Sequence, residues 1–159
     1  MYQKQTVIKG KTITSAFLMA PMVTFGYGVK NGIITDELIS HYEARARGGI
    51  GMIIAEAACV AEDGRLSEYQ TGIWNEDQME GHRMLVSAAH KFKVPILSQL
   101  HHAGIRTVSG RPASPSAFHG TLRGREYTAD EMSEDEILLR EQQFIEAAVR
   151  AGAAGYDGV

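Results

Sequence analysis

The sequence has few of the features that mark several classes of protein. Its single cysteine, Cys59, leaves no possibility of a disulfide within the chain, so we expect a cytoplasmic protein. No apolar run approaches the ~18 residues that span a bilayer, and we therefore expect no membrane partner. A net charge of only −3 argues against a nucleic-acid partner, because proteins that bind nucleic acid usually carry a strong basic excess.

Motifs for metals and for nucleotide phosphates are missing as well. The histidines, the carboxylates and Cys59 do not have the spacing of metal ligands, so we predict no metal site. Neither a P-loop nor a GxGxxG motif after a strand occurs, which removes the usual glycine-rich phosphate sites. An apolar fraction of 44% excludes a disordered chain. The length of 159 residues corresponds to about one domain.

What the sequence does contain is an alternation of short apolar runs and helical patterns. Two runs around Lys9-Gly10, at residues 6–8 and 11–13, predict a small β-hairpin. The remaining apolar runs predict four buried strands, at residues 17–22, 51–57, 94–100 and 156–159.

Three helices are predicted between these strands. Thr35 has the position of an N-cap for the first helix, and Gly48-Gly49 is expected to end it. The second and third helices begin at residue pairs with capping-box spacing, which are Asn75 with Gln78 and Ser133 with Glu136. We expect Gly152 to end the third helix.

Strands that alternate with helices indicate an α/β protein with a parallel sheet and right-handed crossovers. An open doubly wound sheet and part of a (β/α)₈ barrel both fit this order, and a full barrel typically needs about 250 residues. In either architecture, ligands bind at the C-terminal ends of the strands. Those ends are predicted at residues 20–24, 56–59 and 99–103.

Polar residues at these strand ends are the candidates for chemistry. Gln99 can both donate and accept hydrogen bonds, and a histidine at 101 or 102 could bind an oxyanion or move a proton. Neighbouring residues on a strand point to opposite faces, so at most one of the two histidines should face a site. Glu56 lies within an apolar strand, where it could face the site or, as we slightly favour, belong to a structural ion pair.

A long segment between the predicted third strand and third helix, residues 101–132, is interpreted as a functional or mobile loop. Residues 81–125 contain no Asp or Glu but do contain seven Lys and Arg residues, among them Arg106, Arg123 and Arg125. A ligand that carries phosphate could use this positive charge. Alternatively, the acidic residues within 126–136 could neutralise it.

Seven stretches occur in the order found in one known family and cover nearly all of the chain. They are MAPM at 19–22, YEARARGG at 42–49, GMIIAEA at 51–57, GIW at 72–74, QLHHAG at 99–104, Pro115-Ser116, and AGAAGYDGV at 151–159. In these stretches the chain resembles the Old Yellow Enzyme family of FMN-dependent oxidoreductases. The resemblance is greatest to the bacterial NADH:flavin oxidoreductases and 2,4-dienoyl-CoA reductases.

The resemblance implies a fold and an activity. The fold would be a partial (β/α)₈ TIM barrel, with an N-terminal hairpin, about four parallel strands and three helices. Residues 1–159 would then form the N-terminal half of an FMN-binding barrel domain, truncated at the fourth strand. The family passes hydride from NADH or NADPH through FMN to an activated alkene, so the implied substrate is a small enone or enoate.

The resemblance also implies which residues contact the cofactor and the substrate. Backbone groups of four residues would lie against the flavin, namely Ala20, Pro21, Met22 and Val23. Ala57 would contact it from the second strand, and Gln99 would hydrogen-bond the pyrimidine edge of its ring. Phe25 and His102 would lie on the substrate side, although Phe25 lacks the hydroxyl that some members have there, and Val23 cannot supply the hydrogen bond of their Thr or Cys.

No catalytic residue is expected within this chain. In the family, the His-x-x-His or His-x-x-Asn segment that holds the substrate carbonyl begins just past the position of Val159. We therefore expect the chain alone to be inactive. The alternative is a half barrel that serves as an assembly module, and its open strand edges predict a homo-oligomer. A complete doubly wound binding domain unrelated to flavins is a third interpretation, which the ordered motifs disfavour.

Overall fold

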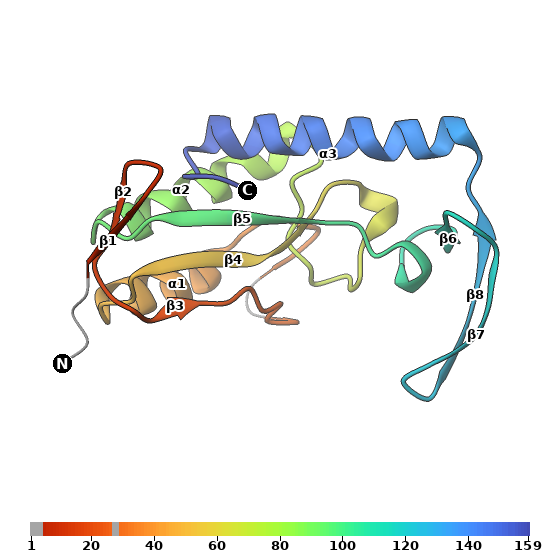
Figure 1. Cartoon of the computed structure of the whole chain (residues 1–159), viewed down its shortest axis with the longest axis horizontal. Helices are drawn as coiled ribbons and strands as arrows, with labels where there is room; N and C mark the ends of the chain where they lie inside the picture. The colour runs from red at the N-terminus through yellow and green to blue at the C-terminus, as the bar shows by residue number, and fades with distance from the viewer. Residues whose placement is uncertain (1–4, 27–28) are drawn as a thin grey trace.

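A parallel sheet lies at the centre of the computed structural model, which describes residues 5–26 and 29–159. Its strands β3 (Leu18–Met19), β4 (Met52–Cys59) and β5 (Ile96–His101) are arranged in the order β3-β4-β5 (Figure 1). Helix α1 (Asp36–Arg47) follows β3, and α2 (Met79–His90) connects β4 to β5. The predicted α/β class with parallel strands is therefore confirmed within the described residues.

One of the four predicted strands is shorter than expected, and another does not form. The first reduces to the two residues of β3. Within the described part of the chain, residues 156–159 form no strand and make a single parallel bridge, between Gly158 and Leu97 of β5. Ser98 donates its backbone N–H to the Gly158 carbonyl, and Asp157 donates to the carbonyl of Ile96. This segment thus lies beside β5 without forming a regular ladder.

The helix boundaries follow from local chemistry. Both predicted capping boxes are present, one before the short 3₁₀ turn that leads into α2 and one before α3 (Glu134–Ala154). Thr35 precedes α1 but makes no side-chain cap bond. The prediction that Gly152 ends α3 is wrong, because the helix continues to Ala154 and ends at Gly155, whose φ of 94° is the left-handed conformation that glycine adopts without strain.

Apolar side chains pack between the sheet and the helices. Ile53 of β4 and Ile96 of β5 are fully buried with Leu38 of α1, Leu85 of α2 and Ala147 of α3. Alternate residues of the same strands, Ile54 and Leu97, lie outside this cluster and are only half-buried. Because successive side chains point to opposite faces of a sheet, the face away from the helices is left partly exposed.

The predicted N-terminal hairpin is confirmed as β1 (Thr6–Ile8) paired with β2 (Lys11–Ile13). It lies at the end of the molecule where the central strands begin (Figure 1). Asp157 anchors it there, because one carboxylate oxygen lies 2.6 Å from Lys11 Nζ. The other oxygen of Asp157 lies 2.8 Å from His90 Nε2 and accepts the backbone N–H of Ile96 at 2.8 Å.

The segment predicted as a long loop contains regular structure at the opposite end of the molecule (Figure 1). A 3₁₀ turn, η3 (Gly104–Arg106), precedes three strands: β6 (Ala113–Ser114), β7 (Phe118–Leu122) and β8 (Arg125–Glu131). Strands β7 and β8 form an antiparallel hairpin, and β6 pairs with β8 in parallel. Arg123 and Gly124 make the hairpin turn with φ angles of 51° and 78°, which a two-residue turn of this kind requires.

No helix in the described parts of the chain is sufficiently long and apolar to cross a membrane.

Candidate functional site

The C-terminal ends of the three parallel strands form one edge, and this edge carries most of the predicted cofactor residues. Residues 20–26 continue from β3, while Ala57 lies near the end of β4 and Gln99 within β5. Ala57 is buried, whereas Gln99 is exposed and its amide has no hydrogen-bond partner among the described residues. Ala20 and Met22 are exposed, and Pro21 and Val23 are half-buried.

An irregularity in β4 sets the positions of these side chains. The β4–β5 ladder pairs Ala55 with Ser98 and then Ala58 with Leu100, so the register shifts by one residue between them. Glu56 and Ala57 are therefore both opposite Gln99. Such bulges redirect side chains and are common next to active sites.

Glu56 is 2% exposed and links this bulge to the segment after β3. Its Oε2 accepts a hydrogen bond from the backbone N–H of Thr24 at 3.3 Å. Its own backbone N–H donates to the Tyr42 hydroxyl of α1 at 2.8 Å. Burial raises the pKa of Glu56, and the polar groups of Thr24 and Tyr42 beside it oppose that rise.

The favoured interpretation of Glu56 as a member of an ion pair is wrong, because it has no ion-pair partner among the described residues. A backbone N–H takes the place of the expected cation. Glu56 Oε1 and the Thr24 hydroxyl are both buried without a hydrogen-bond partner. Buried polar atoms normally have partners, and these two belong to one polar cluster at the strand-end edge, because the Thr24 side chain also acts on the pKa of Glu56.

Gln70 is a residue of this edge that sequence reasoning missed. It is fully buried, and its Nε2 donates to the Ala57 carbonyl at 2.9 Å and lies 3.0 Å from His101 Nδ1. Its Oε1 accepts the backbone N–H of Leu66 at 2.7 Å. The side chain thus joins the ends of β4 and β5 to the loop between them. A glutamine within a polar loop gives no sequence signal for such a role.

His101 is the last residue of β5 and His102 follows it, and the two side chains lie in different surroundings. His101 is half-buried, and its pKa is lowered by burial and by the positive charge of Arg106. His102 packs on Gly64, where a Cβ would lie only 2.2 Å from the ring. Its Nδ1 accepts the backbone N–H of Gly104 at 3.0 Å.

Asp63 and Arg140 complete the surroundings of His102. Arg140 of α3 donates two hydrogen bonds to the Asp63 carboxylate, at 2.9 and 2.7 Å. Asp63 Oδ1 lies 3.8 Å from His102 Nε2, which is too long for a hydrogen bond. Burial and the Arg140 charge lower the pKa of His102, while Asp63 raises it. The ring is thus held against the loop that follows β4.

Phe25 is 58% exposed and has a left-handed backbone, with φ of 49°. A bulky residue seldom adopts this conformation, and strained residues of this kind cluster at functional sites. Val23 supplies no polar group, but the neighbouring Thr24 supplies the orphaned hydroxyl described above. Thr24 was not among the predicted contacts.

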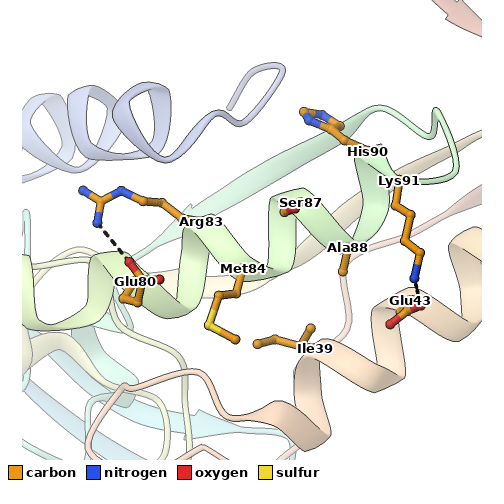
Figure 2. Close-up of a pocket in the computed structure, with 9 residues that line it drawn as sticks. All are labelled: Ile39, Glu43, Glu80, Arg83, Met84, Ser87, Ala88, His90 and Lys91. Atoms are coloured by element: carbon orange, nitrogen blue, oxygen red, sulfur yellow. Dashed lines mark hydrogen bonds and ion pairs between the residues drawn. The ribbon is translucent and has the colours of Figure 1, made fainter.

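A second surface feature is a groove between α1 and α2 (Figure 2). Its charged side chains pair with one another, since Lys91 lies 3.2 Å from Glu43 and Arg83 lies 3.5 Å from Glu80. Ile39 is among its apolar lining residues. None of the predicted site residues lines this groove. Within residues 5–26 and 29–159, no three His, Cys, Asp or Glu residues are grouped to hold a metal ion.

Comparison with known proteins gives a consistent family. The model of the NADH:flavin oxidoreductase / NADH oxidase family matches residues 6–159. The NADPH dehydrogenase of Halalkalibacterium halodurans is 37% identical over 152 residues, which are 95% of this chain and 44% of that protein. The chain thus spans less than half of the length of this curated relative.

Solved structures of similar fold include a homologue from the Old Yellow Enzyme family. The Old Yellow Enzyme homologue from Zymomonas mobilis superposes with a TM-score of 0.85 at 28% identity, over 99% of this chain and 47% of that chain. A 2-naphthoyl-CoA reductase in complex with 2-naphthoyl-CoA has a TM-score of 0.91 at 22% identity, over 99% of this chain and 26% of that chain. The second likeness concerns the fold alone.

Proposed function

The chain belongs to the NADH:flavin oxidoreductase / NADH oxidase family, and from this premise we propose that its strand-end edge forms part of an FMN site. The family that the sequence motifs predicted is thereby confirmed, and it is one of flavoproteins that bind FMN and use NADH or NADPH. We propose that residues 1–159 are the N-terminal half of a (β/α)₈ barrel domain. For the whole protein we propose reduction of a small enone or enoate.

The residues of the edge fit a flat, polar-rimmed cofactor. Ala20 and Ala57 have the smallest side chains that still carry a Cβ, so a ring system can approach the backbone closely. The amide of Gln99 is exposed and unpartnered, and Glu56 and Thr24 have orphaned oxygens. Apolar residues with a few well-placed polar groups are typical of cofactor sites.

Each residue group has a distinct task in this proposal. Gln99 donates and accepts hydrogen bonds at the pyrimidine edge of the ring. The ring is oriented by backbone groups of Ala20, Pro21, Met22 and Val23. Ala57 limits how deeply the ring enters the site. Phe25 and His102 line the substrate side. FMN, when bound, would supply the redox chemistry, which is to accept a hydride from NADH or NADPH and deliver it to the β-carbon of an activated alkene.

The single observation that carries the proposal is the arrangement of Ala57 and Gln99 on neighbouring strands at one edge, within a chain that the family model matches almost throughout. We propose that the 159-residue chain alone does not reduce an enone, since the carbonyl-binding pair expected from the family lies outside this sequence.

The test is a visible absorption spectrum of the purified chain after incubation with FMN and removal of free flavin. We expect a retained flavin spectrum in the unaltered chain. The substitution Gln99→Leu should weaken FMN binding about tenfold. It removes the neutral hydrogen bonds of the amide and leaves the polar edge of the ring without a partner. Gln142→Leu, on the exposed surface of α3, is the matched control. Equal retention in both variants would contradict the role of Gln99.

An assembly module is the second candidate, because apolar residues are exposed beside the open edge of the sheet. Phe17 is 69% and Leu18 48% exposed, and among the described residues β3 pairs only with β4. Unpaired strand edges bind other strands. In this proposal the chain forms a homo-oligomer without catalytic activity. Absence of flavin binding together with a defined oligomer would favour this function over the first.

A further inference from the structure

A pocket that none of the predicted cofactor residues lines lies between the β7–β8 hairpin and η3. It has a volume of about 270 Å³ and is lined by Arg106, Leu122, Arg123, Arg125 and Tyr127. No carboxylate is among the residues that line it. Three arginines from two separate segments of the chain thus line one cavity.

The hairpin register explains why Glu126 does not line this cavity. Leu122 pairs with Arg125, and Gly120 pairs with Tyr127. Cross-strand partners share a face, and residues two apart on a strand share it too. Leu122, Arg125 and Tyr127 therefore line the same face, whereas Glu126 points to the other. The turn adds Arg123.

The positive charge in the pocket is not neutralised within the described residues. Arg106, Arg123 and Arg125 make no ion pair and no side-chain hydrogen bond there, in contrast to Arg111, which is paired with Asp130 and Glu136. Of the two interpretations of the basic segment, neutralisation by the acidic residues that follow therefore holds for Arg111 and fails for these three. Converging unpaired arginines with planar, forked donors suit phosphate.

The pocket adjoins the strand-end edge. Arg106 lies in η3, five residues after the end of β5. Its charge also acts on the pKa of His101, and His101 contacts Gln70 at the edge. A long ligand can therefore place its reacting end at the edge and an anionic end among the arginines.

We propose that Arg106, Arg123 and Arg125 form a binding site for the phosphate or diphosphate group of a nucleotide-bearing ligand whose other end reaches the strand-end edge. That second part rests on the proposed flavin function. Two sources share this chemistry: the phosphates of a nicotinamide dinucleotide and those of an acyl-coenzyme A.

The experiment measures binding of inorganic pyrophosphate to the full chain by isothermal titration calorimetry at low ionic strength. We expect one site, with affinity that falls as salt is added because exposed charges are screened. The double variant Arg123→Gln/Arg125→Gln should bind at least about tenfold more weakly, and Arg106→Gln about fivefold. The control Arg83→Gln, at the exposed groove of Figure 2, should bind as the unaltered chain does.

Absence of pyrophosphate binding, or binding that the arginine substitutions leave unchanged, would overturn the site. Titrations with NADPH, NADH and coenzyme A then distinguish the sources. A loss of affinity in the double variant that is larger for NADPH than for NADH assigns the 2′-phosphate of the reductant. A loss confined to coenzyme A assigns the carrier of the substrate.

Flavin retention in the same variants separates this proposal from the proposed function. The arginine substitutions should leave the FMN spectrum unchanged. A chain that binds no FMN but binds pyrophosphate through these arginines would refute the flavin function and support the anion site. A chain that holds FMN but binds neither pyrophosphate nor NADPH, NADH or coenzyme A would support the flavin function and refute the anion site.

Discussion

A carboxyl group buried among apolar atoms favours its protonated form, and Glu56 is in this situation. The side chain has one hydrogen bond from a backbone N–H and one oxygen without a partner. It lies where the segment after β3 meets β4, so its hydrogen bond fixes Thr24 and the residues beside it. Its protonation state thereby bears on both stability and the shape of the edge.

The raised pKa of Glu56 predicts a pH-dependent stability. Stability from the bound proton is fully present below the ordinary pKa of 4.5 and is lost as pH rises through the raised folded-state pKa. Glu56→Gln removes this titration. We therefore expect the melting temperature of the variant to rise relative to that of the unaltered chain as the pH increases above 4.5.

The measurement is thermal unfolding at several pH values for both proteins. Glu80→Gln is the control, because the side chain of Glu80 is 75% exposed on α2. A difference between Glu56→Gln and the unaltered chain that stays constant with pH would refute the prediction.

A second buried polar group, His82, ties the segment after α3 to the loop before α2. Its Nδ1 lies 2.8 Å from the Tyr156 hydroxyl, and its Nε2 lies 2.8 Å from the Gly72 carbonyl. Burial lowers the pKa of His82, so the ring is held neutral. One ring nitrogen donates to the carbonyl and the other accepts from the hydroxyl.

Removal of the Tyr156 hydroxyl should leave a buried ring nitrogen unsatisfied. We expect Tyr156→Phe to lower the free energy of unfolding by about 1–3 kcal/mol, measured by urea denaturation. Tyr69→Phe is the matched control, because Tyr69 is 48% exposed, and it should change stability by less than about 0.5 kcal/mol. Equal effects of the two substitutions would count against a role for this hydrogen bond.

Among the elements, the helices were the most predictable from sequence and the segment 101–132 the least. The start of helix α3 can be predicted from Ser133 and Glu136, because a capping box depends on two residues three positions apart and on no contact with distant parts of the chain. Its end was misplaced because Gly152 tolerates a helical conformation and only Gly155 turns left-handed. The β7–β8 hairpin was missed because its exposed strands bury few apolar residues and so lack the alternation that indicates a strand.

The site shows the same division between local and distant causes. Gln99 and Ala57 could be placed at the strand-end edge, since both belong to strands with a clear apolar pattern. The roles of Glu56 and Gln70 depend on partners far along the chain. The sequence indicates a buried carboxylate at position 56 but not that a backbone N–H, from Thr24, would be its partner.

Two helical glycines give an opposed pair of predictions. A Cβ at Gly81 in α2 would lie 2.8 Å from Ile34 Cβ and 3.0 Å from its carbonyl oxygen, whereas a Cβ at Gly152 in α3 would meet nothing within 4 Å. We expect Gly81→Ala to lower the free energy of unfolding by about 1–3 kcal/mol through overpacking. Gly152→Ala should raise it by about 0.5–1 kcal/mol through helix propensity.

Chemical denaturation of the two variants beside the unaltered chain checks both signs, and each variant is the control for the other. A stabilising Gly81→Ala would mean that α2 can move away from Ile34.

The surface of the whole molecule carries two exposed groups of apolar residues. Phe17 and Leu18 adjoin the open β3 edge, and Leu138 and Leu139 are exposed at 60% and 50% on α3. We predict self-association through the strand edge, because it offers unpaired backbone groups as well as apolar area. Phe17→Lys/Leu18→Lys should therefore lower the mass measured by light scattering over a range of concentrations.

Leu138→Lys/Leu139→Lys is the matched control and should leave the mass unchanged. A monomer in the unaltered chain, or dissociation by the α3 variant alone, would contradict association through β3.

The contact of Asp157 with Lys11 has a consequence for the order of folding, since it closes nearly the whole chain into one loop. The entropy lost on closure rises with loop length, so contacts within each β-α unit should form before this one. During synthesis, the N-terminal hairpin would lack this contact until Asp157 had emerged from the ribosome. A contact formed after the rate-limiting step slows unfolding without hastening folding. Asp157 therefore governs how long the folded state lasts more than how quickly it is reached.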